Sequence, residues 1–154
     1  MDKDREGAEG GPVAYAPEGL AEGISILRVD PVFSGILAHA GPPRFRRRRN
    51  GFATLLHIIL EQQVSIDAAA AMHRRLLGLC RPLMPETFLD LDDGTLRSCG
   101  FSRQKMGYAR HLAELVAGGD FDFARLARAD DEAAMAQLLS IKGIGRWSAE
   151  VALL

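Results

Sequence analysis

The fold is decided by residues 138–149, which read LLSIKGIGRWSA. This stretch predicts two helices joined by a tight hairpin at 143–145, because glycine permits positive φ and a close approach of backbones. The first amides of the helix after Gly145 lack intrahelical acceptors, and the helix dipole adds partial positive charge there. Such a helix end can bind an anion, and a DNA phosphate fits. Ile144 is expected to tuck between the two helices.

The glycine pair alone favours an ordinary corner between two helices with glycine caps. The flanking residues change that interpretation. Lys142 precedes the turn, and Arg146-Trp147-Ser148-Ala149 follows it. Positive charge on both sides of the turn favours an anion-binding hairpin.

The rest of the sequence predicts an all-α fold. Apolar residues from Phe52 to Leu60 follow the three-four spacing of an amphipathic helix. Further helices are expected over about 20–27, from the Asp30-Pro31 cap to about 40, from Ser65, around Phe88, and up to Gly100. More follow from Ser102 to 116, briefly over 121–126, from Asp130 to 139, and from Arg146 or Trp147 onward. No segment alternates with period two for long enough to predict a strand.

Charge is distributed unevenly in a chain of net charge −1. Residues 1–40 carry a net charge of −4 and residues 82–154 a net charge of −3, whereas residues 41–81 carry +6, largely from the run Arg44–Arg49. The run is typical of a solvated loop, and it also offers non-specific affinity for DNA.

Composition restricts the class of protein. The 154 residues are 47% hydrophobic and 25% charged, as expected for a globular domain, and the acidic, glycine-rich start is not expected to be a secretory signal. Residues 1–18 are expected to be a disordered tail and residues 19–154 a helical domain, with the hairpin unit over 130–154. Cys80 and Cys99 lack metal-ligand spacing, so we expect reduced thiols and no metal site.

Three blocks in order resemble the helix-hairpin-helix DNA glycosylases of the alkylated-purine type (DNA-3-methyladenine glycosylase II). The first is IILEQQVS over 58–65, the second LRSCGFSRQK over 96–105, and the third the hairpin itself. The family commonly has proline where this chain has Lys142. The resemblance covers residues 20–154 and implies a helical bundle whose second lobe is incomplete.

The resemblance also implies roles for individual residues. Enzymes of this family remove damaged bases by flipping the nucleotide out of the duplex into a pocket between two lobes. Gln63 falls where the family inserts a side chain into the gap in the stack, although a polar helix end explains it equally well. Trp147 falls where an aromatic residue lines the base pocket, although core packing explains it equally well. The hairpin is expected to bind the phosphate backbone, with a monovalent cation at its carbonyls, through Lys142, Gly143, Ile144, Gly145 and Arg146.

The family's catalytic aspartate follows the second hairpin helix, beyond Leu154 in this numbering. Glu150 stands too close to Trp147 for that role, so no catalytic residue is assigned and the 154 residues alone are expected to be inactive. The helix over 149–154 lacks a C-cap, which favours a chain that continues. No lysine stands at the hairpin end for lyase chemistry, and this favours a monofunctional glycosylase.

Two alternatives stay open. A non-catalytic helix-hairpin-helix DNA-binding module predicts salt-sensitive binding without base release, and a helical protein-interaction domain predicts no DNA affinity. The glycosylase is expected to be a monomer that binds double-stranded DNA and no membrane, and to lie with the nucleoid in the cytoplasm if the source is bacterial. We also expect Gly145→Ala to weaken DNA binding, because the added Cβ would oppose the hairpin conformation and crowd the phosphate.

Overall fold

The computed structural model describes residues 14–15, 19–43, 45–46 and 49–154. The described part is helical apart from two short strands, β1 (Ala14–Tyr15) and β2 (Phe45–Arg46), which pair antiparallel with Ala14 opposite Arg46. Two residues per strand are too few to produce a period-two pattern in the sequence. Most of the expected tail, residues 1–13 and 16–18, lies outside the described residues.

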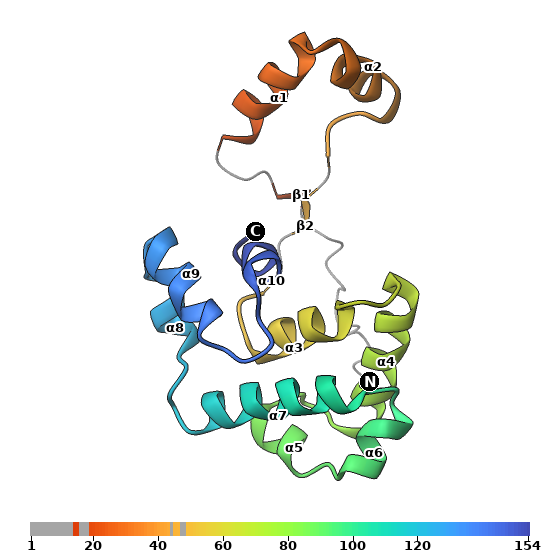
Figure 1. Ribbon diagram of the computed structural model, residues 1–154, viewed down its shortest axis with the longest axis vertical. Coiled ribbons are helices and arrows are strands. Elements are labelled where there is room, and N and C mark those ends of the chain that lie inside the picture. Colours follow the sequence, from red (N-terminus) through yellow and green to blue (C-terminus); the bar gives the residue numbers. More distant parts are fainter. Residues whose placement is uncertain (1–13, 16–18, 44, 47–48) are drawn as a thin grey trace, which may run out of the picture. The chain divides into compact units, whose positions relative to one another are not determined.

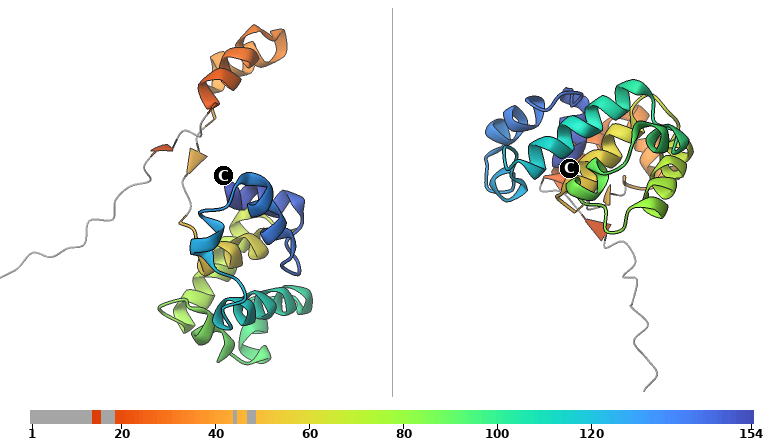
Figure 2. Two further views of the ribbon diagram at one scale, coloured as in Figure 1. Left: turned by 90° about the vertical axis from the view of Figure 1, so that its left-hand side faces the viewer. Right: turned by 90° about the horizontal axis from the view of Figure 1, so that it is seen from below.

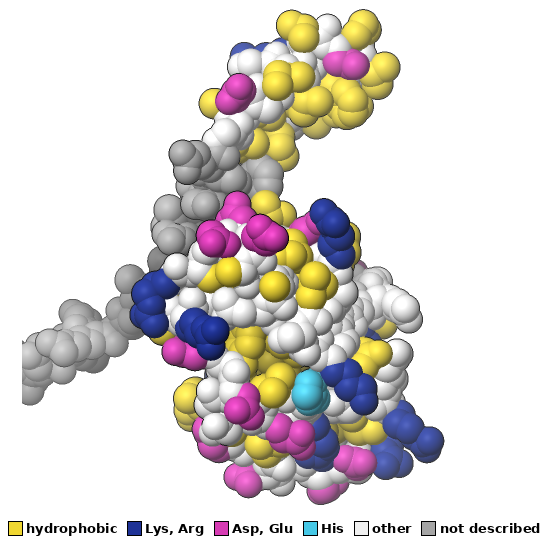
Figure 3. Space-filling view, turned by 60° about the vertical axis from the view of Figure 1, so that its left-hand side comes forward, with side chains coloured by type: hydrophobic (Ala, Val, Ile, Leu, Met, Phe, Trp, Pro, Cys, Tyr) yellow, Lys and Arg dark blue, Asp and Glu magenta, His cyan; other side chains and the backbone are white. Residues whose placement is uncertain are grey.

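The chain divides into two compact units, 1–47 and 48–154. The first contains α1 (Leu20–Val29) and α2 (Pro31–Ala40), which pack against each other. The Asp30 carboxylate caps α2 by accepting hydrogen bonds from the amides of Val32 and Phe33. Figure 3 shows many hydrophobic side chains on the surface of this unit, and the exposed ones include Ile26, Val29, Val32, Phe33 and Ile36.

The second unit is built around α3 (Phe52–Glu61), which lies between α10 (Arg146–Leu153) and α7 (Arg103–Ala117) in Figure 1. Helix α4 (Ile66–Leu79) also packs on α3, while α5 (Pro85–Leu89) and α6 (Asp93–Ser98) pack on α7. Helix α8 (Phe123–Leu126) precedes α9 (Asp131–Leu139), and both further views in Figure 2 keep α9 beside α10. Helix α3 thus brings together the turn between α3 and α4, helix α7, and the hairpin between α9 and α10.

Burial explains why α3 is central. Its side chains Leu56, Ile58, Ile59 and Leu60 are completely buried, so apolar residues cover most of its circumference. A helix that is hydrophobic on nearly all sides must be surrounded by other elements, and α4, α7 and α10 surround this one. Among the described residues, no helix has the length and apolar character needed to span a membrane.

Helices α4, α7 and α9 start at the predicted cap residues Ser65, Ser102 and Asp130. Each cap side chain accepts a hydrogen bond from a first-turn amide, which stabilises a helix by about 1 kcal/mol. The side chains that accept such bonds in the second unit are Ser65, Asp92, Ser102, Asp122 and Asp130.

Candidate nucleic-acid interface

The hairpin between α9 and α10 contains two glycines, and its conformation requires glycine at only one of them. Gly143 has φ +91°, and a Cβ built there would lie 2.8 Å from Cδ1 of Tyr108 and closer still to two other ring atoms. The backbone of the turn therefore rests directly on the Tyr108 ring of α7. Gly145 differs, because its φ of −91° suits any residue and a Cβ there would meet nothing within 4 Å. The expectation that a Cβ at Gly145 opposes the hairpin conformation is therefore wrong.

Ile144 closes the hairpin from inside. It is 4% exposed, and its amide donates to the carbonyl of Ile141, 3.0 Å away. The following residue, Gly145, is the N-cap of α10 and has no side chain that could accept from the first-turn amides. The start of α10 therefore has a partial positive charge that no cap side chain neutralises.

The turn between α3 and α4 faces the hairpin. The side-chain amide of Gln62 donates to the carbonyl oxygen of Gly143 at 2.7 Å and to Oγ of Ser148 at 3.2 Å. The next residue, Gln63, is exposed and has φ +55°, which is rare for a residue other than glycine. One glutamine of the pair therefore joins the turn to the hairpin, and the other projects outward.

Lys105 connects the same turn to α7. Its side chain is 8% exposed, and its ammonium donates to the carbonyl oxygens of Ile59, Leu60 and Gln62 at 2.9, 2.8 and 2.6 Å. Burial lowers the pKa of Lys105. The three carbonyl oxygens, two of them at the negative end of α3, partly offset this effect of burial, because they stabilise the charged ammonium.

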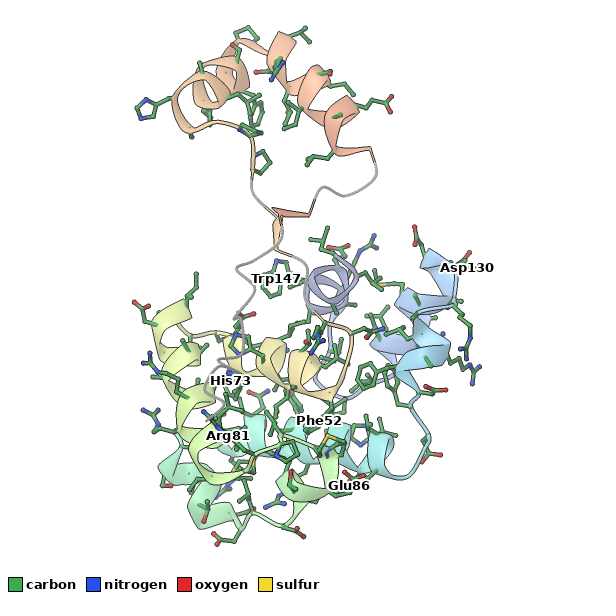
Figure 4. All side chains as sticks on the ribbon, turned by 180° about the vertical axis from the view of Figure 1, so that it is seen from behind. Phe52, His73, Arg81, Glu86, Asp130 and Trp147 are labelled. Carbon is green, nitrogen blue, oxygen red and sulfur yellow. The ribbon has the colours of Figure 1, made fainter. Side chains whose placement is uncertain are left out.

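A cleft of about 630 Å³ opens between the turn, the start of α7 and the hairpin. Trp147 stands on its wall with 62% of its surface exposed (Figure 4), which is unusual for a residue of this size and hydrophobicity. The lining residues are Glu61, Gln62, Gln63, Val64, Ser102, Gln104, Lys105, Tyr108, Gly143, Gly145, Trp147 and Ser148.

The structure brings Gln63, Gly143, Gly145 and Trp147 together on this cleft. Lys142 and Arg146 are exposed, and both are sequence neighbours of residues that line the cleft. The Arg146 guanidinium pairs with the Glu150 carboxylate of the same helix at 2.9 Å. Most of the arginine run falls outside the described side chains; of its members, Arg49 alone has a described one, and it is exposed.

Two histidines pack against each other between α3 and α4. The rings of His57 on α3 and His73 on α4 meet edge to face with centroids 4.6 Å apart, and Figure 4 shows His73 beside α3. His57 Nε2 lies 3.1 Å from the Glu61 carboxylate. Burial and the neighbouring His57 lower the pKa of His73. Within the described residues, no three His, Cys, Asp or Glu side chains cluster in a way that would hold a metal ion, and Cys80 and Cys99 are buried and free.

Two helices joined by a glycine hairpin, with the first-turn amides of the second helix left without a cap side chain, form the helix-hairpin-helix arrangement, and here it lies beside a cleft with an exposed indole. Residues 56–149 match the family model described as HhH-GPD superfamily base excision DNA repair protein. Because the match covers more than half of the chain, the protein belongs to this superfamily.

Similar proteins are consistent with that membership. The chain is 30% identical over 117 residues to DNA-3-methyladenine glycosylase 1 of Schizosaccharomyces pombe, covering 73% of this chain and 51% of that protein. Its structure resembles a DNA-3-methyladenine glycosidase from Bacillus halodurans with a TM-score of 0.68 and 33% identity, over 82% of this chain and 64% of that one. It also resembles an S. pombe 3-methyladenine DNA glycosylase in complex with abasic DNA, with a TM-score of 0.71 and 26% identity, over 84% and 66%. The chain thus spans about half the length of the first of these relatives.

Sequence reasoning missed Gln62, Lys105 and Tyr108 as members of the site. Lys105 is the last residue of the block over 96–105. A lysine is ordinarily exposed, so nothing in the sequence indicated that this one is buried. Tyr108 stands one helical turn after Lys105, and this three-residue spacing predicts that both face the same side of α7.

Proposed function

We propose that this protein is a base-excision DNA glycosylase that hydrolyses the N-glycosidic bond of alkylated purines after flipping the nucleotide into the cleft beside Trp147. The observation that carries the proposal is the exposed indole on the cleft wall, next to the hairpin. An exposed tryptophan in a concave site is expected where a ligand with a flat face is to be stacked. A protein with this function acts on chromosomal DNA, which in a bacterial source is the nucleoid in the cytoplasm.

The chemistry of the substrate fits this wall. Alkylation at a purine ring nitrogen gives the base a positive charge, and an aromatic face attracts a cation beyond simple stacking. Trp147 supplies such a face. It is the second residue of α10, and so it lies in the first turn, beside the uncapped N-terminus of that helix. The hairpin amides and the exposed Lys142 and Arg146 would hold the phosphates on either side of the flipped nucleotide.

Gln63 is proposed to fill the gap that the flipped base leaves. It projects from a turn that the hairpin holds through Gln62, so the side chain that fills the stack and the amides that bind phosphate are fixed relative to each other. This coupling is what a base-flipping protein requires, because both must reach the same nucleotide.

The catalytic carboxylate is proposed to lie outside the described residues. Glu150 is held by Arg146 on the same helix, and the carboxylate that lines the cleft, Glu61, is held by His57. For a monovalent cation at the hairpin, main-chain carbonyls are suitable donors. The Gly143 carbonyl already accepts from Gln62, so the other carbonyls of the turn would have to hold it.

The test compares two duplexes that differ at one position, an undamaged one and one with a tetrahydrofuran abasic-site analogue. Fluorescence anisotropy measures the Kd of the 154-residue chain for both over a range of salt concentrations. A glycosylase of this kind binds the abasic duplex more tightly, and Trp147→Ala serves as the matched variant. Equal affinity for both duplexes supports the non-catalytic module, and no binding at low salt eliminates both functions.

Base release is measured separately, on methylated DNA, with the protein extended by whatever its gene encodes after residue 154. Mass spectrometry identifies the bases set free. An aspartate in that extension together with no release of methylated purines would refute the proposed activity.

A further inference from the structure

The turn that carries Gln63 has the backbone angles of a type II β-turn. Gln62 has φ −61° and ψ 127°, and Gln63 has φ +55°. Type II turns demand positive φ at their third residue, which is why glycine or asparagine normally stands there. Glutamine at this position is strained, and a strained residue persists only where its surroundings hold it.

The four residues of this turn, 61–64, can adopt another conformation without strain. If the Gln62–Gln63 peptide rotates by about half a turn, the loop becomes a type I turn in which the third residue has negative φ. That rotation reverses the Gln62 carbonyl. It therefore changes the direction in which Gln63 leaves the turn without moving α3 or α4.

We propose that Lys105 is the positioning residue that prevents this rotation. Its ammonium binds the Gln62 carbonyl at 2.6 Å, the shortest of its three contacts. The other two contacts, to Ile59 and Leu60 at the end of α3, fix the ammonium itself. A buried cation with three carbonyl acceptors, and with no carboxylate partner among the described residues, thus holds one peptide plane, and through it the projection of Gln63.

The proposal concerns a backbone conformation, so it has a test that needs no DNA. Thermal unfolding is measured for Gln63→Gly and Gln63→Ala, which both remove the side chain. With Lys105 in place, the glycine variant should have the higher Tm, by about 4 °C, because glycine alone is unstrained at positive φ. With Lys105→Met in the same chain, the order should reverse, because the turn is then type I and glycine only adds flexibility to the unfolded chain.

If Lys105→Met fails to fold, Lys105→Gln takes its place. Its side chain is polar but shorter, so it cannot reach the Gln62 carbonyl, and the same reversal is expected. A glycine variant that stays more stable than the alanine variant in the Lys105-substituted chain overturns the proposal. A merely structural lysine would lower every Tm without reversing this order.

A second test rests on the proposed function. Without Lys105, about one molecule in ten would keep the type II turn, so the preference for the abasic duplex, measured as the Kd for the undamaged duplex divided by the Kd for the abasic duplex, should fall about tenfold. Gln63→Ala should also lose the preference, and adding Lys105→Met to it should cause no further loss. An unchanged abasic preference in the Lys105 variant refutes the positioning role. No preference in the unsubstituted chain refutes the proposed function instead, and the order of Tm values still decides on Lys105.

Discussion

Replacing Gly143 with alanine should destabilise the second unit by about 2–5 kcal/mol, and the structure separates two causes. The first is the backbone angle, because φ +91° costs a residue with a Cβ about 1–2 kcal/mol. The second is overlap with the Tyr108 ring, which the new methyl group would enter. Forcing an extra methyl into a packed site costs about 1–3 kcal/mol.

Urea unfolding followed by circular dichroism measures the free energy of unfolding, and two further variants separate the causes. In a Tyr108→Ala background the overlap disappears, so Gly143→Ala should cost only the backbone term. Gly145→Ala is the matched control, because its φ is −91° and its Cβ would lie in open space. It should change stability by less than about 0.5 kcal/mol. If Gly143→Ala costs no more than Gly145→Ala, the contact between hairpin and α7 does not hold the turn.

Three further perturbations test other parts of the site. Gly145→Ala should weaken duplex binding about tenfold in an anisotropy titration, because its Cβ would keep a phosphate from the α10 amides; unchanged Kd would remove the hairpin from the interface. Trp147→Ala should reduce the preference for abasic over undamaged DNA more than it reduces overall affinity, and should leave urea stability within about 0.5 kcal/mol, since the indole is largely exposed; a large loss of stability would indicate a packing role. The pKa of His73 lies below its ordinary value of 6.5, because burial and His57 disfavour the charged form. The unfolded chain therefore binds the proton first, and stability that is complete above pH 6.5 should fall as the pH falls below it. His73→Gln should flatten this dependence, and an equal slope in both proteins would show that another group causes it.

The positions of the helices could be predicted from the sequence because their starts are local chemistry. An aspartate or serine that caps a helix needs only its own next three residues, and Asp30, Ser65 and Ser102 all cap where the pattern predicted. The hairpin was predicted for the same reason. The all-α fold followed from these short-range patterns, and the structure confirms it.

The contacts that complete the site could not be predicted in this way, because they join residues far apart in sequence. Lys105 reaches Ile59 across 46 positions, and Gln62 reaches Gly143 across 81. The positive φ of Gln63 also left no signal, since glutamine is not a residue that marks such a conformation. The division after residue 47, which places α1 and α2 in a unit of their own, likewise depends on tertiary contacts.

Trp147 is the chain's single tryptophan. Its place on the cleft wall means that the tryptophan fluorescence of this protein comes from one indole that is largely exposed to water. A molecule that enters the cleft should quench that emission or move it to shorter wavelength. The protein therefore contains its own optical reporter of occupancy, and titrations can be read without attaching a dye.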